Sequence, residues 1–186
     1  MRKFLKWVGI SLATVVGAIL VLVAVLVFLG GRKLSATRTV AVEPVAVPGD
    51  PAAVERGAHL VRTRCVFCHG EDLGGKKFIE DPAFMLLNAP NLTRGAGGIG
   101  GTYTDAQWEA AIRHGLAADG RRLVVMPSNE YQFLSDEDLG TIIAYLRTVP
   151  AVDRTGPTQR VGPLARALYA GGVFPMFPAK AVTHGD

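Results

Sequence analysis

Cysteine is nearly absent from this 186-residue chain, which contains only Cys65 and Cys68. A structural zinc site would need a second pair of ligands, and the sequence has no other cysteine to supply it. A thioredoxin-like redox pair would need alternating strands and helices around it, a pattern that the sequence does not show. The scarcity of cysteine therefore leaves zinc binding and disulfide exchange without support.

Charge is absent from residues 7–31. About 20 apolar residues suffice to cross the hydrocarbon core of a bilayer, so we interpret this run as a transmembrane anchor helix. The alternative is a cleaved signal peptide, whose apolar part should be about half as long and should end at a small-x-small site. Gly9, Ala13 and Gly17 form a face of small residues on which another helix could pack.

Acidic side chains are absent from residues 1–33, which hold five of the 20 basic ones. The rest of the chain carries 15 basic side chains against 16 acidic ones, so the net charge of +4 belongs to the flanks of the apolar helix. The sequence therefore gives no support to nucleic-acid binding. Lysine and arginine flank both sides of the helix equally, so they do not orient it.

The two cysteines belong to Cys65-Val66-Phe67-Cys68-His69, the C-x-x-C-H pattern by which c-type haem is attached. Two thiols at this spacing can each form a thioether to a haem vinyl group, and the adjoining His69 can direct an imidazole nitrogen at the iron. We therefore predict one covalently attached haem c. Because covalent haem c is made outside the cytoplasmic membrane in bacteria, we expect the chain beyond the anchor to lie in the periplasm.

Proline, glycine and charge divide the chain into four expected segments. Residues 1–33 form a cytoplasmic flank and the anchor, 34–50 a tether with Pro44 and Pro48, 51–150 the haem domain, and 151–186 a C-terminal tail. The tether has no helical periodicity, so we expect it to be semi-extended and to let the domain stand off the bilayer or lie on a partner.

Three helices are expected in the haem domain, which we predict to be all-α. The first begins at Asp50-Pro51 and ends on Cys65, the second begins with a capping box at Thr104, and the third begins at Ser135. Residues 70–101 are rich in glycine and proline and are expected to form a loop whose backbone wraps closely around the haem. The lysine and hydroxyl of a P-loop are missing, so this loop does not predict phosphate binding.

A sixth iron ligand is needed if the haem is to carry electrons, and a methionine thioether would raise the reduction potential. The candidates after His69 are Met85, Met126, Met176, His114 and His184. Position favours Met126, which lies in a loop between two expected helices, is followed by Pro127, and is far enough along the chain to reach the opposite haem face. The other four stay open on sequence grounds.

Residues 65–150 resemble a class I c-type cytochrome. The resemblance rests on the C-x-x-C-H motif and on four further runs of sequence, which are Ala89-Pro90-Asn91-Leu92-Thr93, the Gly-Thr-Tyr-Thr-Asp start of the middle helix, Met126-Pro127, and the last helix from Leu-Ser-Asp-Glu-Asp-Leu to Ala144-Tyr145-Leu146-Arg147. In detail the chain is similar to membrane-anchored single-haem cytochromes and to cytochrome subunits of bacterial membrane-bound dehydrogenases.

The resemblance implies roles for individual residues. It implies thioether attachment at Cys65 and Cys68, with His69 as the proximal and Met126 as the distal iron ligand. It implies that the Pro90 carbonyl accepts the second ring N–H of His69. It also implies that Tyr103 and Trp108 line the haem or its propionates, and that the first and last helices cross at Gly57 and Tyr145.

Two features beyond this pattern have two interpretations each. Lys76 and Lys77 lie in an insert before Pro90; they are either ordinary solvated side chains or a patch that steers a redox partner. The tail contains a short helix after Gly162-Pro163 and an apolar, proline-broken run at 173–178 that cannot form a conventional strand. We interpret the tail as a strap over the haem domain, and the alternative is a surface buried against another membrane subunit.

The sequence therefore predicts a membrane-anchored monohaem cytochrome c, not an enzyme, that carries single electrons between protein partners on the outer face of the cytoplasmic membrane. The expected partners are a dehydrogenase, a respiratory complex or a terminal oxidase, with no nucleic acid and no small-molecule substrate at iron. An alternative is an obligate electron-transfer subunit of a membrane dehydrogenase or respiratory complex. A further alternative is a haem peroxidase or ligand sensor with a dissociable sixth ligand, against which Met126 and the lack of an output domain argue.

Overall fold

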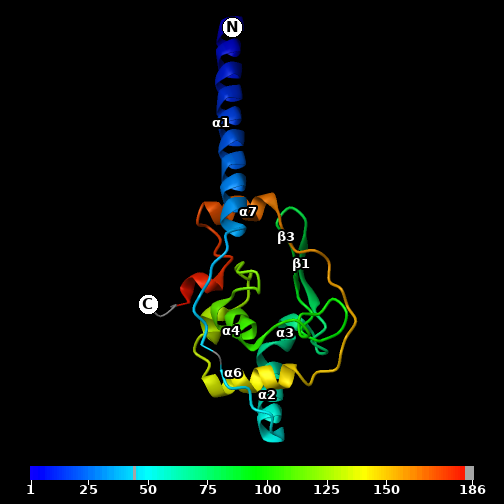
Figure 1. Cartoon of the computed structure of the whole chain (residues 1–186). Coiled ribbons are helices and arrows are strands. Elements are labelled where there is room, and N and C mark those ends of the chain that lie inside the picture. Colours follow the sequence, from blue (N-terminus) through cyan, green and yellow to red (C-terminus); the bar gives the residue numbers. More distant parts are fainter. Residues whose placement is uncertain (44, 183–186) are drawn as a thin grey trace.

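Helix α1 (Arg2–Leu34) projects away from the rest of the chain in the computed structural model (Figure 1). The structure describes residues 1–43 and 45–182. Almost every side chain of α1 is exposed although the helix is strongly apolar. By length and composition α1 is able to cross a membrane, and a signal sequence near the N-terminus would meet the same criterion.

The segment that follows α1 has extended backbone, as the prolines predict, but it packs along the domain instead of spacing it from α1. It runs down one side of the domain to the start of α2 (Figure 1). Arg38 donates its backbone N–H to the Gly120 carbonyl at 2.8 Å, and Val45 is buried in the main core. The described part of this segment is therefore packed against the domain; Pro44 lies outside the described residues.

The main core forms where helices α2 (Pro51–Arg64), α4 (Asp105–His114) and α6 (Asp136–Leu146) meet. The structure confirms the three predicted helix starts, since Asp50, Thr104 and Ser135 each accept a hydrogen bond from a backbone N–H three residues on. Two one-turn helices, α3 (Val66–His69) and α5 (Ser128–Tyr131), follow Cys65 and Met126-Pro127 respectively. Helices α2 and α6 cross at the end of the domain opposite α1 (Figure 1).

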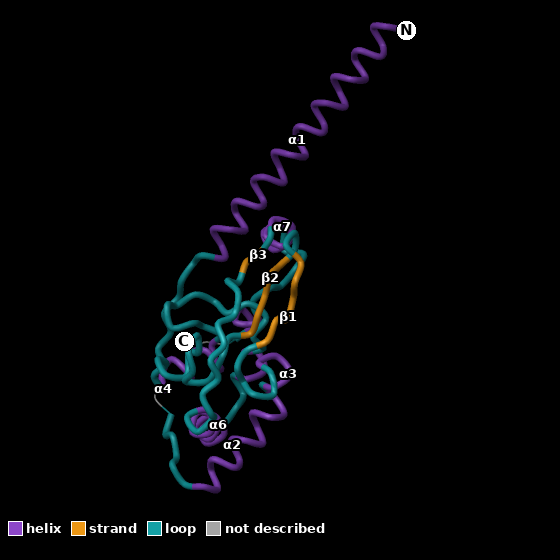
Figure 2. The backbone as a smooth tube through the Cα atoms, turned by 90° about the vertical axis from the view of Figure 1, so that its right-hand side faces the viewer, coloured by secondary structure: helices purple, strands orange, loops and turns teal. Residues whose placement is uncertain are grey.

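The all-α prediction is wrong in one respect, because the structure also contains a small antiparallel sheet. Strands β1 (Lys76–Asp81) and β2 (Met85–Ala89) form a hairpin, and β3 (Arg160–Val161) pairs with β2 (Figure 2). Neither strand of the hairpin alternates apolar and polar residues cleanly, so the sequence carries no period-2 signal there. The Asp81 carboxylate closes the turn by accepting the backbone N–H groups of Ala83 and Phe84.

The described part of the C-terminal tail packs on the hairpin, and the choice between a strap and a partner-binding surface stays a prediction. Helix α7 (Pro163–Ala170) begins at the predicted Gly162-Pro163, and the 3₁₀ helix η1 (Pro178–Ala181) follows. No strand forms in the described run 173–178. A second apolar cluster joins the hairpin to the tail through six buried residues, Met85, Leu87, Ala165, Tyr169, Met176 and Phe177.

Candidate haem site

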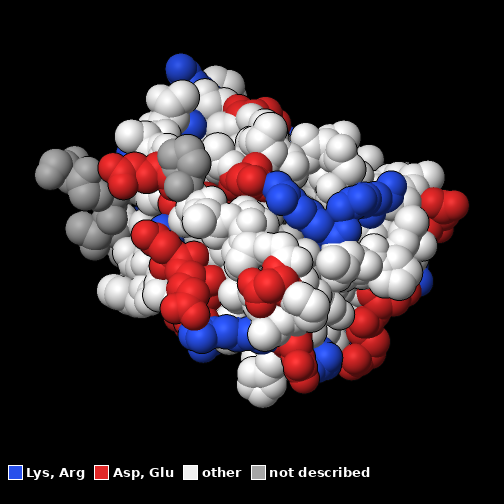
Figure 3. Space-filling view, turned by 60° about the horizontal axis from the view of Figure 1, so that its bottom comes forward, with Lys and Arg blue, Asp and Glu red and all other residues white. Residues whose placement is uncertain are grey.

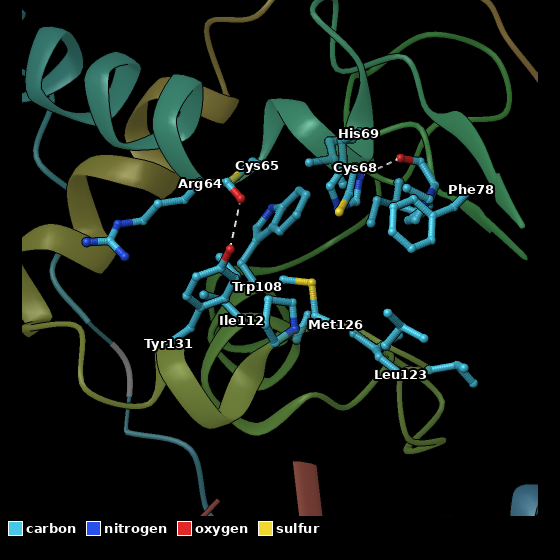
Figure 4. A pocket seen from close by; sticks show the side chains of 18 of the residues that line it. Arg64, Cys65, Cys68, His69, Phe78, Trp108, Ile112, Leu123, Met126 and Tyr131 are labelled. Atoms are coloured by element: carbon cyan, nitrogen blue, oxygen red, sulfur yellow. Dashed lines mark hydrogen bonds between the residues drawn. The ribbon is translucent and has the colours of Figure 1, made fainter. Parts of the chain in front are cut away.

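An apolar pocket lies between α3, α4, α5 and the loop that carries Met126 (Figure 4). Its empty space, including the open mouth, is about 1090 Å³, and most of its lining is apolar. The seven residues that the sequence indicated as haem-binding candidates all line this pocket: Cys65, Cys68, His69, Pro90, Tyr103, Trp108 and Met126. The fold therefore gathers into one cavity residues that are spread over more than sixty positions of the sequence.

Cys65 and Cys68 lie at the end of α2 and within α3 and are not joined to each other. Burial, with a smaller effect of Cys68 and against an opposing effect of Arg64, raises the pKa of the Cys65 thiol to about 11. Burial also raises the pKa of Cys68, against an opposing effect of Lys76. A redox-active C-x-x-C pair needs a lowered thiol pKa, so this environment argues against disulfide exchange.

His69 is almost completely buried, and its Nδ1 lies 2.9 Å from the carbonyl oxygen of Pro90. A carbonyl can only accept, so Nδ1 carries the proton and Nε2 keeps its lone pair. Burial lowers the pKa of His69, and the Pro90 hydrogen bond opposes this only in part. The ring is therefore held as the neutral tautomer that binds metal, through the hydrogen bond that the cytochrome resemblance implies.

Met126 faces the pocket from the side opposite His69 (Figure 4). Met85 and Met176 are fully buried in the second apolar cluster and do not line the pocket, and neither does His114. His184 lies outside the described residues. Of the candidates that the structure describes, Met126 is the one placed to meet a haem held by His69.

The backbone beside Met126 is held in an unusual conformation. Val125 has a φ of +65°, which is rare for a β-branched residue and is a left-handed conformation costing roughly 1–2 kcal/mol. Its backbone N–H donates to the carbonyl of Met176 at 3.0 Å. The tail thus contacts the residue next to the candidate ligand. The two positions are about fifty residues apart, and no local pattern in the sequence predicts that they meet.

Trp108 and Tyr103 form one wall of the pocket. Trp108 is 4% exposed, and its ring centroid lies 5.2 Å from that of Tyr103. The Tyr103 hydroxyl accepts the backbone N–H of Ala118 at 3.3 Å. Both residues also belong to or pack against the main core, so the same side chains shape the pocket and stabilise the domain.

Tyr131 is a pocket residue that sequence reasoning missed. It lies on α5, five residues after Met126, and its hydroxyl donates to the Arg64 carbonyl at 2.8 Å (Figure 4). It thereby ties the Met126 side of the pocket to the end of α2, next to Cys65. The only signal in the sequence was an aromatic residue shortly after Met126-Pro127, which core packing explains equally well.

Tyr131 should make stability depend on alkaline pH. Burial, with smaller effects from Cys65 and Cys68, raises its pKa to about 12, whereas a tyrosine in an unfolded chain titrates near 10. The unfolded state therefore loses its proton first, and stability should fall as the pH rises from about 10 to about 12. We expect Tyr131→Phe to reduce this fall, measured as the urea midpoint at pH 9 and at pH 11. Equal pH dependence in both proteins would show that Tyr131 ionises freely in the folded state.

The loop of residues 90–101 is anchored to the start of the tail. Asn91 Nδ2 donates to the Val152 carbonyl at 2.7 Å, and the Thr93 hydroxyl accepts the Val152 N–H at 2.9 Å. A Cβ at Gly95 would lie 2.2 Å from the Val152 carbonyl oxygen. Pro90, Leu92 and Ile99 of this loop line the pocket, so a loop that wraps closely around a haem stays a prediction. Its glycines also let it pack against the backbone of residues 92–93 and 152–155.

Thr93→Val should loosen this anchor and with it the Pro90 carbonyl. Thr93 is fully buried, and its hydroxyl also donates to Asn91 at 2.8 Å and accepts the Gly95 N–H at 3.2 Å. Buried N–H groups left unpaired cost about 1–3 kcal/mol, so we expect a loss of that size in urea unfolding. Thr148→Val is the control, because the Thr148 hydroxyl is exposed and bonds only within its own turn, to Tyr145. Equal stability of the two variants would contradict the anchoring role.

Lys76 and Lys77 lie on β1 near the C-x-x-C-H turn. Lys76 Nζ lies 5.6 Å from the ring centroid of Phe67 and donates to its carbonyl at 3.4 Å, while Lys77 pairs with Glu80 at 2.6 Å. Phe67 itself is 75% exposed. Both lysines have partners within the chain, which favours the interpretation of them as ordinary surface side chains.

Comparison with known proteins gives the same picture of the domain. The family model described as cytochrome c matches residues 54–150. The fructose dehydrogenase cytochrome subunit of Gluconobacter japonicus is 32% identical over 144 residues, which cover 72% of this chain and 28% of that protein. The alcohol dehydrogenase (quinone) cytochrome c subunit of Gluconacetobacter polyoxogenes is 32% identical over 105 residues, or 52% of this chain and 22% of that one.

A third relative, the gluconate 2-dehydrogenase cytochrome c subunit of Pantoea cypripedii, is 33% identical over 103 residues, which cover 50% of this chain and 22% of that protein. The chain thus spans less than a third of the length of these three relatives. All three are named as cytochrome subunits of dehydrogenases. For the described residues, no cluster of three or more His, Cys, Asp and Glu side chains suggests a separate metal site.

Proposed function

Because this chain belongs to the cytochrome c family, we propose that it is the electron-transfer cytochrome of a dehydrogenase, accepting electrons from a catalytic partner and passing them on. The observation that carries this proposal is the similarity over 72% of the chain to a dehydrogenase cytochrome subunit. The sequence first suggested a free-standing carrier, with the subunit as its alternative, and the relatives favour the subunit. The chain itself is an electron carrier and not the catalyst.

The residues of the pocket fit a covalently attached haem c. Two thiols, a neutral imidazole and a thioether converge on one apolar cavity, and thioether with imidazole is the ligand pair found in cytochromes c. When bound, the haem supplies a one-electron iron couple that needs no proton and no substrate at the metal. Cys65 and Cys68 would hold it covalently, and His69 and Met126 would ligate the iron.

The protein contributes ligand geometry and exclusion of water. The Pro90 carbonyl fixes the His69 tautomer and the plane of its ring. Trp108, Ile112, Leu123 and other apolar side chains keep water from the cavity, which favours the less charged, reduced state. Phe78 lines the pocket and is 37% exposed. Its ring centroid lies 6.1 Å from that of Phe67, which is also exposed.

We further propose that α1 stays attached and anchors the chain in the cytoplasmic membrane, with the haem domain on the outer face. The uncharged run of residues 7–31 supports spanning, and covalent haem attachment supports the outer location. A Cβ built at Gly9 or Gly17 would meet no atom from another part of the chain within 4 Å, so the small-residue face is available to a helix of a partner subunit.

The test is purification of the tagged full-length chain from its own membranes in mild detergent. We expect a stoichiometric larger partner, and we expect the haem spectrum to become that of the reduced form when the partner's substrate is added. Fructose, a simple alcohol and gluconate are the first substrates to try, because the relatives are named as subunits of fructose, alcohol and gluconate dehydrogenases. A Cys65→Ala, Cys68→Ala double variant is the matched control, since it should retain the partner but show no haem absorbance.

A haem protein that purifies alone, and changes oxidation state only by exchange with separate complexes, would support the free-standing carrier instead. Binding of cyanide or carbon monoxide to the native protein at modest concentration would favour a peroxidase or sensor, because it would require an open or dissociable sixth position.

A further inference from the structure

Helix α7 lies across the end of α1, backbone against backbone. In Figure 1 it runs across the domain end of α1, and Figure 2 shows it nearly end-on beside the same end of that helix. Gly30 is the one buried residue of α1, and a Cβ there would lie 2.2 Å from the carbonyl oxygen of Arg166 on α7. Lys33 Nζ donates to the Ala170 carbonyl at the end of α7 at 3.5 Å.

The depth of this crossing matches the surface of a bilayer. At 1.5 Å per residue, Gly30 lies about 35 Å along α1 from Trp7, slightly more than the roughly 30 Å of a hydrocarbon core. If α1 spans the membrane, the crossing at Gly30 therefore falls at the boundary between hydrocarbon and headgroups. A helix that runs across α1 at this level lies along the surface of the membrane.

Helix α7 carries only one charged side chain, Arg166. Ala165 and Tyr169 face the second apolar cluster, whereas Leu164 is 52% exposed and Val173, just after the helix, is 73% exposed. In residues 163–175 the only charged side chain is Arg166. A helix that faces water normally carries polar side chains on its outer face. The apolar outer face of α7 therefore does not match a water-exposed helix.

Basic side chains flank this apolar surface at the same level. Arg32 and Lys33 close α1, and Arg166 projects beside Gly31, its Nη1 lying 3.5 Å from a Cβ built there. Lysine and arginine at this depth favour phosphate headgroups. An apolar face with a basic edge is the pattern of a helix that lies in a membrane interface.

The opposite end of the domain has the reverse character. Figure 3 shows that end, with acidic and basic side chains interspersed over its surface. There Arg56 of α2 pairs with Glu137 and Asp138 of α6 across the exposed side of the helix crossing. The exposed apolar side chains at Leu164 and Val173 thus contrast with the charged surface at the opposite end of the domain.

We propose that α7 and the turn of residues 171–174 form an interfacial surface, which rests on the lipid headgroup boundary of the same membrane that α1 spans. This rests on the proposed anchoring role of α1. Together with the packed segment after α1, the surface fixes the height and orientation of the haem pocket above the bilayer. The haem domain then meets its redox partner at a fixed height above the bilayer and does not move on a flexible tether.

The test places a photoreactive benzoylphenylalanine at Leu164, at Val173 or at Glu55 in the full-length chain in its native membranes. Glu55 is the control, because it is exposed on α2 at the far end of the domain. After irradiation we expect phospholipid adducts by mass spectrometry at 164 and 173, several-fold more than at 55. Cross-links to a protein at 164 and 173 would show that a partner subunit covers this surface, and adducts no more frequent than at 55 would show that it faces water; either result overturns the proposal.

Alkaline extraction of the same membranes separates this proposal from the anchoring one. A chain that stays in the pellet but gives no lipid adducts at 164 and 173 retains its anchor and lacks the interfacial surface. A chain released into the supernatant, with an N-terminus beyond residue 34, has lost α1 and overturns both proposals.

Discussion

Met126→Leu is expected to lower the reduction potential of the haem by on the order of 0.1 V, within the range of about 0.8 V over which axial ligands set haem potentials. The substitution keeps the approximate volume and removes the sulfur, so the fold should survive. A thioether stabilises the reduced state, and its loss should favour the oxidised one. The measurement is a spectroscopic redox titration, together with carbon monoxide binding, which the variant should show and the native protein should not.

The chain provides two matched controls for this experiment. Met85 and Met176 are both completely buried, but they lie in the second apolar cluster and not in the pocket. Met85→Leu and Met176→Leu should therefore leave the potential near its native value. A potential that moved with Met85 or Met176 and stayed constant with Met126 would refute the ligand assignment.

Gly57→Ala is expected to destabilise the domain by roughly 3 kcal/mol or more, at or above the usual cost of overpacking a core. A Cβ at this position would lie 2.0 Å from the Thr141 carbonyl oxygen and 3.0 Å from Cβ of Tyr145. The first of these atoms belongs to the backbone of α6 and cannot rotate away. The two helices would have to separate. The free energy that this separation costs exceeds the roughly 1 kcal/mol that alanine gains over glycine in helix propensity.

Urea unfolding of the haem-loaded protein measures this effect. The control is Gly49→Ala, eight residues upstream, where a Cβ would have no neighbour within 4 Å and stability should hardly change. If Gly57→Ala were as stable as the native protein, α2 and α6 would have to cross with more space than the structure shows. Because α2 ends on Cys65, we also expect the variant to incorporate less haem during maturation.

Local patterns in the sequence were sufficient wherever the chemistry is local. The C-x-x-C-H run places two thiols and an imidazole within one turn, and the capping residues Asp50, Thr104 and Ser135 define helix starts through hydrogen bonds to residues three positions on. The hydrogen bond of His69 to the Pro90 carbonyl came from the resemblance and is present in the structure. These features depend on the spacing of residues along the chain, which can be read directly from the sequence.

Contacts between distant segments could not be read in the same way. The hairpin of β1 and β2 lacks an alternating pattern, and its stability comes from burying Met85 and Leu87 against the tail. The contact of Val125 with Met176, and that of Tyr131 with Arg64, join segments whose proximity depends on the whole fold. The glycines of residues 95–100 indicated that the backbone packs closely there. The sequence did not show which segments they pack against, which are residues 152–155 and the backbone of the same loop.

The sequence by itself determined that this chain has one haem-attachment motif, one apolar helix long enough to span a membrane, and helices that begin at three capped positions, because each is set by residues adjacent in the chain. Only the tertiary structure decided that Met126, and not Met85 or Met176, faces His69, and that α7 lies at the level of Gly30. These depend on how the apolar surfaces of the hairpin, the tail and the three core helices bury one another, and that arrangement is a property of the folded chain as a whole.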